Sequence, residues 1–234
     1  MNFDDKSVLI TGAAGNLGRA VAQAFADQGA RLALVDRRTD DLRKAFGDES
    51  PRRLFVAADL LQPEQAGAAV STVVDRLGRI DVLCNLAGGF RMGPAVHDTP
   101  AATWDFLFDL NARTVLHMAQ AVVPHMIEVG AGKVVNVGAF AAQRGAAQMG
   151  AYIASKSAVI RLTETMAAEL RERGINVNCV LPTVIDTPEN RAAMPDTDPA
   201  RWVAPRDLAS VIVFLASDAA RAIHGAALPV TGLA

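Results

Sequence analysis

A tyrosine and a lysine stand four residues apart in the segment 151–156, and this pair is the clearest candidate for chemistry in the chain. Tyr152 and Lys156 would share one face of a helix, because residues at i and i+4 are neighbours on a helix surface. A nearby ammonium favours the phenolate, so it lowers the pKa of a phenol from its usual value of about 10. The spacing predicts a general acid–base pair, with a surface helix that carries both residues by coincidence as the alternative.

A second motif lies near the N-terminus, where an apolar segment at 7–10 leads into TGAAGNLG at 11–18. Gly12 permits a tight turn, while Gly15 and Gly18 permit close approach of a pyrophosphate and of the next helix to the sheet. The backbone N–H groups of Asn16, Leu17 and Gly18 would then face an anion at the start of that helix. This strand–turn–helix context predicts a dinucleotide site.

The choice between the two nicotinamide dinucleotides depends on the residues after the second apolar segment, at 31–35. Asp36 there would accept hydrogen bonds from the adenosine ribose hydroxyls and repel a 2′-phosphate. Arg37 and Arg38 could instead contact a 2′-phosphate or form a solvated surface pair. The sequence favours NAD(H) and does not exclude NADP(H).

The elements that must position these residues alternate along the chain. Strands are expected at 7–10, 31–35, 54–57, 82–85, 133–137, 176–180 and 227–230, and helices at 17–28, 64–77, 104–129, 151–173 and 205–216. Apolar strands separated by helices predict a parallel sheet covered on both faces. We therefore predict an α/β, doubly wound (Rossmann) fold with seven strands, formed by residues 1–234 as a single domain.

Composition narrows the classes of function. The 234 residues include 23 basic and 25 acidic side chains, and no basic block suggests nucleic acid or an anionic membrane. No apolar run reaches the ~18 residues of a membrane helix, and the N-terminus lacks a signal-peptide pattern. Cys84 and Cys179 lie in apolar segments and are interpreted as buried thiols in a reducing compartment. We expect a cytoplasmic protein with a small-molecule substrate and no metal.

Several ordered motifs resemble the short-chain dehydrogenase/reductase family over essentially the whole chain. They are Thr11-Gly12, Asp59-Leu60 after the third strand, Asn85-Leu86-Ala87-Gly88 after the fourth, Asn111 in the long helix, Tyr152-x-x-x-Lys156, and Pro182 with Thr187. The resemblance implies an NAD(P)(H)-dependent oxidoreductase that transfers a hydride between the nicotinamide and a small carbonyl or alcohol.

The resemblance also implies roles for the matching residues. Tyr152 would be the acid–base, and Lys156 would bind the nicotinamide ribose as well as tune the phenol. Asn111 would hold a water in a proton relay behind Lys156, or be a satisfied polar group inside a helix. The other matches would bind the cofactor: Asp59 and Leu60 at the adenine, Asn85, Ala87 and Gly88 along its border, and Pro182 and Thr187 near the carboxamide.

Three positions depart from the usual pattern of the family. Ala139 stands where most members place a serine that polarises the substrate carbonyl, while Asn16 and Thr183 stand where glycine is usual. Losing one donor to a developing oxyanion can cost ~10²–10³ in rate. The chain is then a weak catalyst, uses another donor such as Gln143 or Gln148, or has a substrate that needs no serine.

The last explanation gains support from the dihydropteridine reductases of this family, which also carry alanine in place of that serine. The chain resembles them in its glycine spacing, in Ala87-Gly88-Gly89-Phe90, and in LPTVIDTPENR at 181–191 followed by Met194-Pro195 and Trp202. This implies a quinonoid pterin substrate, with Phe90 and Trp202 flanking a flat ring or simply packing in loops. The alternatives are a ketone, 3-oxoacyl, sugar or alcohol substrate, and a cofactor-binding regulator without catalysis.

The two long helices at 104–129 and 151–173 suggest self-association. They carry more Ala, Val, Leu and Met side chains than one buried stripe needs. Helices of this kind commonly form subunit contacts in the family, so we expect a homodimer or homotetramer.

Overall fold

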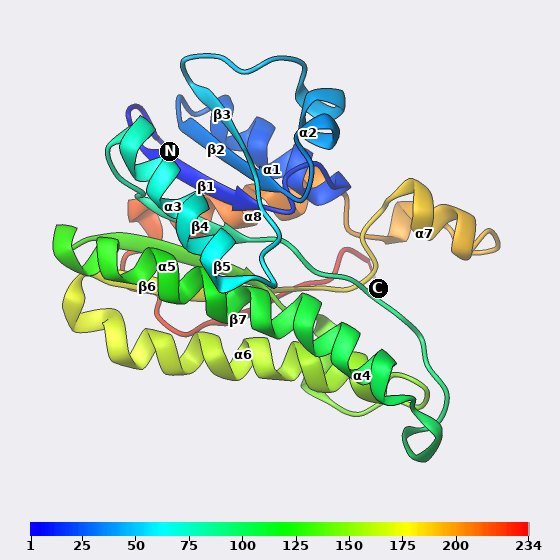
Figure 1. Cartoon of the computed structure of the whole chain (residues 1–234). Coiled ribbons are helices and arrows are strands. Elements are labelled where there is room, and N and C mark those ends of the chain that lie inside the picture. Colours follow the sequence, from blue (N-terminus) through cyan, green and yellow to red (C-terminus); the bar gives the residue numbers. More distant parts are fainter. Residues whose placement is uncertain (234) are drawn as a thin grey trace.

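The computed structural model describes residues 1–233 and contains a parallel sheet in the order β3-β2-β1-β4-β5-β6-β7, with helices on both faces (Figure 1). The strands are β1 (Ser7–Thr11), β2 (Arg31–Asp36), β3 (Arg53–Ala57), β4 (Val82–Asn85), β5 (Gly132–Val137), β6 (Ile175–Pro182) and β7 (Ala227–Val230). The strand order reverses between β1 and β4, which opens a crevice at their carboxyl ends. The predicted seven-stranded, doubly wound fold is confirmed.

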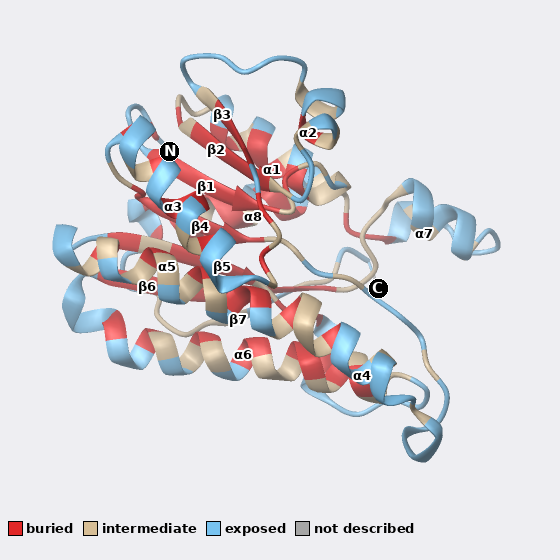
Figure 2. Ribbon diagram, viewed as in Figure 1, coloured by how far each residue is buried: buried red, intermediate tan, exposed pale blue. Residues whose placement is uncertain are grey.

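Two apolar clusters hold helices against the two faces of the sheet. The helices are α1 (Asn16–Ala26), α2 (Thr39–Phe46), α3 (Pro63–Leu77), α4 (Ala101–Phe108), α5 (Thr114–Val129), α6 (Gly150–Leu170), α7 (Pro188–Ala193) and α8 (Pro205–Ala216). Side chains of α1, α2 and α8 pack on one face, and those of α3, α5 and α6 on the other. Figure 2 shows the buried sheet between them, while α7 is mostly exposed and stands beyond the strand ends.

The helices depart from the sequence prediction in three places. Neither α2 nor α7 was predicted, because α2 buries only Leu42 and α7 buries no residue, so neither shows an apolar stripe. The helix expected at 104–129 begins at Ala101 and contains a π-helical turn at Asp109–Arg113. Such turns occur inside α-helices, frequently at functional sites.

The register of the central strands brings their carboxyl ends to one level. Thr11 on β1 pairs with Asn85 on β4, which in turn pairs with Asn136 on β5. The Thr11 hydroxyl accepts hydrogen bonds from the backbone N–H groups of Leu86 (3.0 Å) and Ala87 (3.2 Å). This threonine therefore ties the glycine loop to the segment that follows β4.

The cysteines, membrane-spanning helices and metal-binding clusters were also considered in the sequence. Cys84 and Cys179 are both free and buried, as expected for core thiols. Across residues 1–233, no helix combines the length and the apolar character needed to cross a membrane. Within the same residues, no three His, Cys, Asp or Glu side chains are grouped so that they could hold a metal ion.

Candidate functional site

A cleft with a volume of about 1790 Å³ lies at the carboxyl ends of the strands. This exceeds the roughly 300–1,000 Å³ typical of a site for one drug-sized ligand, so it has room for a dinucleotide and a substrate together. The sequence-predicted residues that line it are Gly12, Gly15, Asn16, Leu17, Gly18, Asp36, Ala87, Gly88, Tyr152, Lys156, Pro182 and Thr187. Residues far apart in the sequence are thus brought to one surface.

The glycine loop is shaped for close backbone approach. Gly12 has a φ of +63°, and a Cβ atom there would lie 3.0 Å from the backbone of Ala87. A Cβ atom on Gly18 would overlap the carbonyl oxygen of Gly12. Gly15 caps α1 without a side-chain hydrogen bond, which leaves the first N–H groups of the helix for a ligand. These features fit a dinucleotide pyrophosphate at the helix N-terminus.

The Asp36 carboxylate is fixed at the end of β2. One oxygen accepts the backbone N–H of Ala14 (2.9 Å), and the other accepts that of Arg37 (2.8 Å). Asp36 lines the cleft together with Lys44 of α2, whereas the Arg37 side chain does not. Asp41 of α2 also lines this end of the cleft and forms an ion pair with Arg38 (3.8 Å), whereas the Asp36 carboxylate is held against the glycine loop.

Tyr152 and Lys156 lie on the first turns of α6 and both line the cleft. The Lys156 Nζ atom is buried and donates a hydrogen bond to the carbonyl of Val137 (2.8 Å). Burial raises the pKa of Tyr152 to about 12 and lowers the pKa of Lys156 to about 8. The expectation that the lysine lowers the pKa of the phenol is wrong for this structure, because burial penalises both charged forms.

Asn111 lies in the π-helical turn and is buried. Its Oδ1 atom accepts the backbone N–H of Gly89 (2.9 Å), and its Nδ2 atom donates to the Gly89 carbonyl (3.1 Å) and to the Ser155 hydroxyl (3.0 Å). Ser155 donates in turn to the carbonyl of Tyr152 (2.8 Å). Asn111 thus holds the segment after β4 against the helix that carries the tyrosine.

A close approach links Asn111 to the lysine. A Cβ atom on Gly88 would lie 3.0 Å from Asn111 Oδ1 and 3.1 Å from Lys156 Nζ, so both side chains reach the same glycine. Ser155 was not predicted as a site residue, and Thr11 was predicted only as part of the Thr-Gly motif. Ser155 directly precedes Lys156, and that proximity was the signal available.

Four sequence-predicted cofactor residues are not part of the cleft lining: Arg37, Asp59, Leu60 and Asn85. The Asp59 carboxylate accepts the N–H of Leu61 (3.0 Å), which shapes the turn after β3. Asn85 is buried and donates to Asn136 Oδ1 (2.9 Å), which joins β4 to β5 beneath the cleft. Asp59 and Asn85 thus stabilise a turn and two strand ends, and none of the four residues lines the cleft.

The positions that depart from the family pattern have distinct surroundings. Ala139 is buried at the cleft wall, in a small apolar cluster that also contains Cys179. The Gln143 side chain donates to the carbonyl of Phe140 (3.3 Å), within its own turn. Of the two aromatic residues expected to flank a ring, Trp202 is buried outside the cleft lining. Phe90 does line the cleft.

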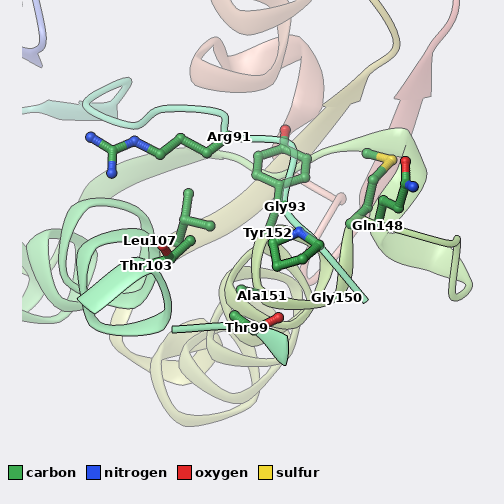
Figure 3. Close-up of a pocket in the computed structure, with 11 residues that line it drawn as sticks. Arg91, Gly93, Thr99, Thr103, Leu107, Gln148, Gly150, Ala151 and Tyr152 are labelled. Atoms are coloured by element: carbon green, nitrogen blue, oxygen red, sulfur yellow. The ribbon is translucent and has the colours of Figure 1, made fainter. Parts of the chain in front are cut away.

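The Phe90 ring stands edge-on to Tyr152, with ring centroids 4.9 Å apart and an interplanar angle of 87°. A second cavity, of about 10 Å³, lies beside the tyrosine (Figure 3). It has room for about one water. Gln148 lines this cavity and not the cleft, while Arg91 extends away from Tyr152 and stacks on Phe106 (3.7 Å).

Comparison with known proteins identifies the protein family. The family model for short chain dehydrogenases matches residues 6–198. D-threitol dehydrogenase of Mycolicibacterium smegmatis is 37% identical over 243 residues, covering 98% of this chain and 93% of that protein. Sorbitol dehydrogenase of Cereibacter sphaeroides is 38% identical over 187 residues, covering 80% and 73%.

A solved structure extends the comparison to three dimensions. The crystal structure of an NAD⁺-bound xylitol dehydrogenase superimposes with a TM-score of 0.89 at 29% identity, covering 99% of this chain and 100% of that one. The chain belongs to the short-chain dehydrogenase/reductase family and is an oxidoreductase of that family. Members of the family bind nicotinamide dinucleotides, as the xylitol dehydrogenase complex illustrates.

Proposed function

We propose that residues 1–234 act as a single domain that interconverts a small alcohol and its carbonyl compound, with NAD(H) as the hydride carrier. One observation carries this proposal: Tyr152 and the buried Lys156 share a cleft with the glycine loop. A dinucleotide whose pyrophosphate lies at the N-terminus of α1 would extend along the strand ends toward this pair.

The residues around the pair take separate roles in the proposal. The Tyr152 hydroxyl gives its proton to the carbonyl oxygen during reduction, and the phenolate accepts the alcohol proton during oxidation. Lys156 holds ribose hydroxyls of the bound dinucleotide. Bound NAD(H) would supply or accept the hydride. Asn111 supports the proton relay behind Lys156 and fixes the geometry through Gly89 and Ser155.

The preference for NAD(H) rests on Asp36. Its carboxylate lines the cleft beside the glycine loop, where it would accept ribose hydroxyls and repel a 2′-phosphate. Arg37, which could contact a 2′-phosphate, is not among the residues that line the cleft. Steady-state kinetics with both cofactors test the preference, and an equal or higher kcat/KM with NADP(H) would contradict it.

Replacement of the tyrosine tests the acid–base role. We expect Tyr152→Phe to lower kcat by about 10²–10⁴ because the proton donor is lost, while NADH affinity changes by less than about twofold. Tyr152 is the only tyrosine in the chain, so its near-ultraviolet titration reports this phenol alone. NAD⁺ binding should move its pKa downward from about 12. A regulator without catalysis would bind NADH and show no effect of the substitution.

Two substrate classes are candidates for this site. The relatives that act on D-threitol and sorbitol favour an alcohol–carbonyl pair. A quinonoid pterin is the second candidate, and Ala139 favours it because reduction of such a ring needs no hydroxyl to polarise a ketone. NADH oxidation with quinonoid dihydropterin, set against a panel of ketones, separates them. Robust ketone reduction without pterin turnover would exclude a quinonoid pterin as the substrate.

Assembly and location complete the proposal. We propose a homodimer or homotetramer, because exposed apolar side chains gather on α4 and α5: Trp104, Phe106, Leu116 and Val129. Static light scattering measures this directly, and a monomer at micromolar concentration would contradict it. The free buried thiols of Cys84 and Cys179 are consistent with the cytoplasm, which we propose as its location.

A further inference from the structure

The substrate half of the cleft differs in character from the dinucleotide half. We define the substrate half as the lining residues of segments 86–92, 137–149 and 182–194, together with Tyr152 and Lys156. These segments follow, or end, strands β4, β5 and β6. The dinucleotide half comprises the lining residues of 12–19, Asp36 and α2.

Apolar side chains form most of the walls of the substrate half. Phe90 is 55% exposed, Met92 60% and Phe140 37%, which is high for residues of this size. Further apolar lining includes Ala139, Ala146, Met149, Val184, Ile185 and Met194. Exposed apolar surface gathered around a cavity marks a binding site for an apolar group. The ring of Phe90 offers an aromatic edge or face to a ring in the ligand.

Most polar side chains of the substrate half already form hydrogen bonds to other groups of the protein. Thr183 donates to the Thr231 carbonyl (2.9 Å), and Asn190 donates to the Ile185 carbonyl (2.8 Å). Glu189 accepts the amide of Asn16 (2.7 Å) across the cleft. Thr187 caps α7, Gln143 bonds its own turn, and Lys156 bonds Val137. A linear polyol, with a hydroxyl on each carbon, would find few free partners here to replace water.

Two polar side chains of this half have no hydrogen-bond or ion-pair partner among residues 1–233. One is the phenol of Tyr152, which the proposed function assigns to the reacting oxygen. The other is the guanidinium of Arg144, which lines the cleft and is exposed. A guanidinium presents a planar fork of donors that matches a carboxylate in a bidentate pair. Arg144 is thus the free cation that a second group of the substrate would meet.

We propose that the substrate is a small, largely apolar ring compound bearing a hydroxyl or keto group and, away from it, a carboxylate. The reacting oxygen meets Tyr152, the ring lies against Phe90 and Phe140, and the carboxylate pairs with Arg144. In the oxidation the carbinol C–H bond breaks, its hydride passes to NAD⁺, and the hydroxyl proton passes to the Tyr152 phenolate. This inference rests on the proposed function and narrows its substrate class.

A set of three alcohols tests the inference with NAD⁺. They are a hydroxylated cyclohexanecarboxylate, cyclohexanol as its neutral counterpart, and xylitol as a linear polyol. We expect kcat/KM to fall in that order. We expect Arg144→Gln to lower kcat/KM for the carboxylate by about 10–100-fold, mainly through KM, because a charged hydrogen bond is lost. The same variant should leave cyclohexanol within about twofold, and Arg144→Lys should be intermediate for the carboxylate.

Binding gives a second measurement that does not depend on turnover. Cyclohexanecarboxylate, added with NADH, should raise the thermal midpoint of the parent protein and not that of Arg144→Gln. Phe90→Ala should weaken both ring compounds, whereas Phe90→Leu should retain much of their binding.

Three results would overturn the inference. They are xylitol as the best substrate, equal effects of Arg144→Gln on the carboxylate and on cyclohexanol, and no turnover of either ring. The proposed function is judged separately. If xylitol is oxidised and Tyr152→Phe abolishes that activity, the proposed function stands and the ring-acid substrate fails. If NADH binds but no alcohol, ketone or quinonoid pterin reacts, the proposed function fails as well.

Discussion

The two halves of the cleft are built in different ways. In the dinucleotide half, backbone contacts of the glycine loop shape the site: Gly18 packs on the Gly12 carbonyl, and Asp36 holds the backbone of Ala14. In the substrate half, three segments from separate strands meet, and exposed side chains such as Phe90 provide the surface. The difference indicates that backbone fit governs the first half and that side-chain choice governs the second.

Lys156 lies where the halves meet, and its burial gives the largest effect on stability that we expect. Its pKa falls from 10.5 to about 8 on folding, so between these values the unfolded chain binds more protons than the folded chain. The free energy of unfolding should therefore rise with pH across that window, by roughly 3 kcal/mol at most. Lys156→Met should remove this rise.

Urea unfolding at about pH 7 and about pH 10 measures the difference between parent and variant. The variation common to both proteins, such as that from the buried Cys84, cancels in the comparison. Lys44→Met, which changes an exposed lysine, is the control. An identical pH dependence of parent and Lys156→Met would show that the lysine is solvated in solution.

Gly18→Ala tests whether backbone fit governs the dinucleotide half. The added methyl group would overlap the Gly12 carbonyl oxygen, so the turn must shift, at a cost of about 1–3 kcal/mol. We expect NADH to bind about 10–100-fold more weakly, as measured by fluorescence titration. Gly67→Ala in α3 is the matched control, because its Cβ atom would meet nothing within 4 Å and should stabilise the helix. Unchanged NADH affinity in Gly18→Ala would contradict the backbone-fit account.

Ala139→Ser tests whether side-chain choice governs the substrate half. A serine at this wall would supply a hydroxyl toward a ketone oxygen, and we expect kcat for a simple ketone to rise by up to about tenfold. We expect a smaller gain than the full contribution of an oxyanion donor because Ala139 packs in an apolar cluster. Ala142→Ser, at a buried neighbour outside the cleft lining, is the control. A fall in kcat would show that the apolar wall itself is required.

Asn16→Gly gives the smallest expected effect. Asn16 donates to Glu189 on α7 (2.7 Å), which joins the two halves across the cleft. Because this hydrogen bond is exposed, its loss should speed NADH release by only about 2–5-fold in stopped-flow measurements. Glu189→Gln keeps an acceptor at the same place and should have a weaker effect. If both variants release NADH at the parent rate, the contact does not restrain α7.

Much of the fold could be predicted because its signals are local. The apolar segments that became β1 to β7 alternate with amphipathic helices, and that periodicity is written in neighbouring residues. The glycine loop at 12–18 is likewise a property of consecutive residues, since a turn and a helix start need particular backbone freedom. The spacing of Tyr152 and Lys156 placed them on one helix face, and both line the cleft.

Tertiary structure decided everything that depends on distant neighbours. Burial at the meeting of α6 and β5 raised the pKa of Tyr152 to about 12, against the direction that the adjacent lysine alone suggests. Asn85 lies beneath the cleft because its partner is Asn136 on β5, and Trp202 is buried outside the cleft lining. Spacing along the chain determines which residues share an element, but solvation and hydrogen-bond partners follow only from how the elements pack.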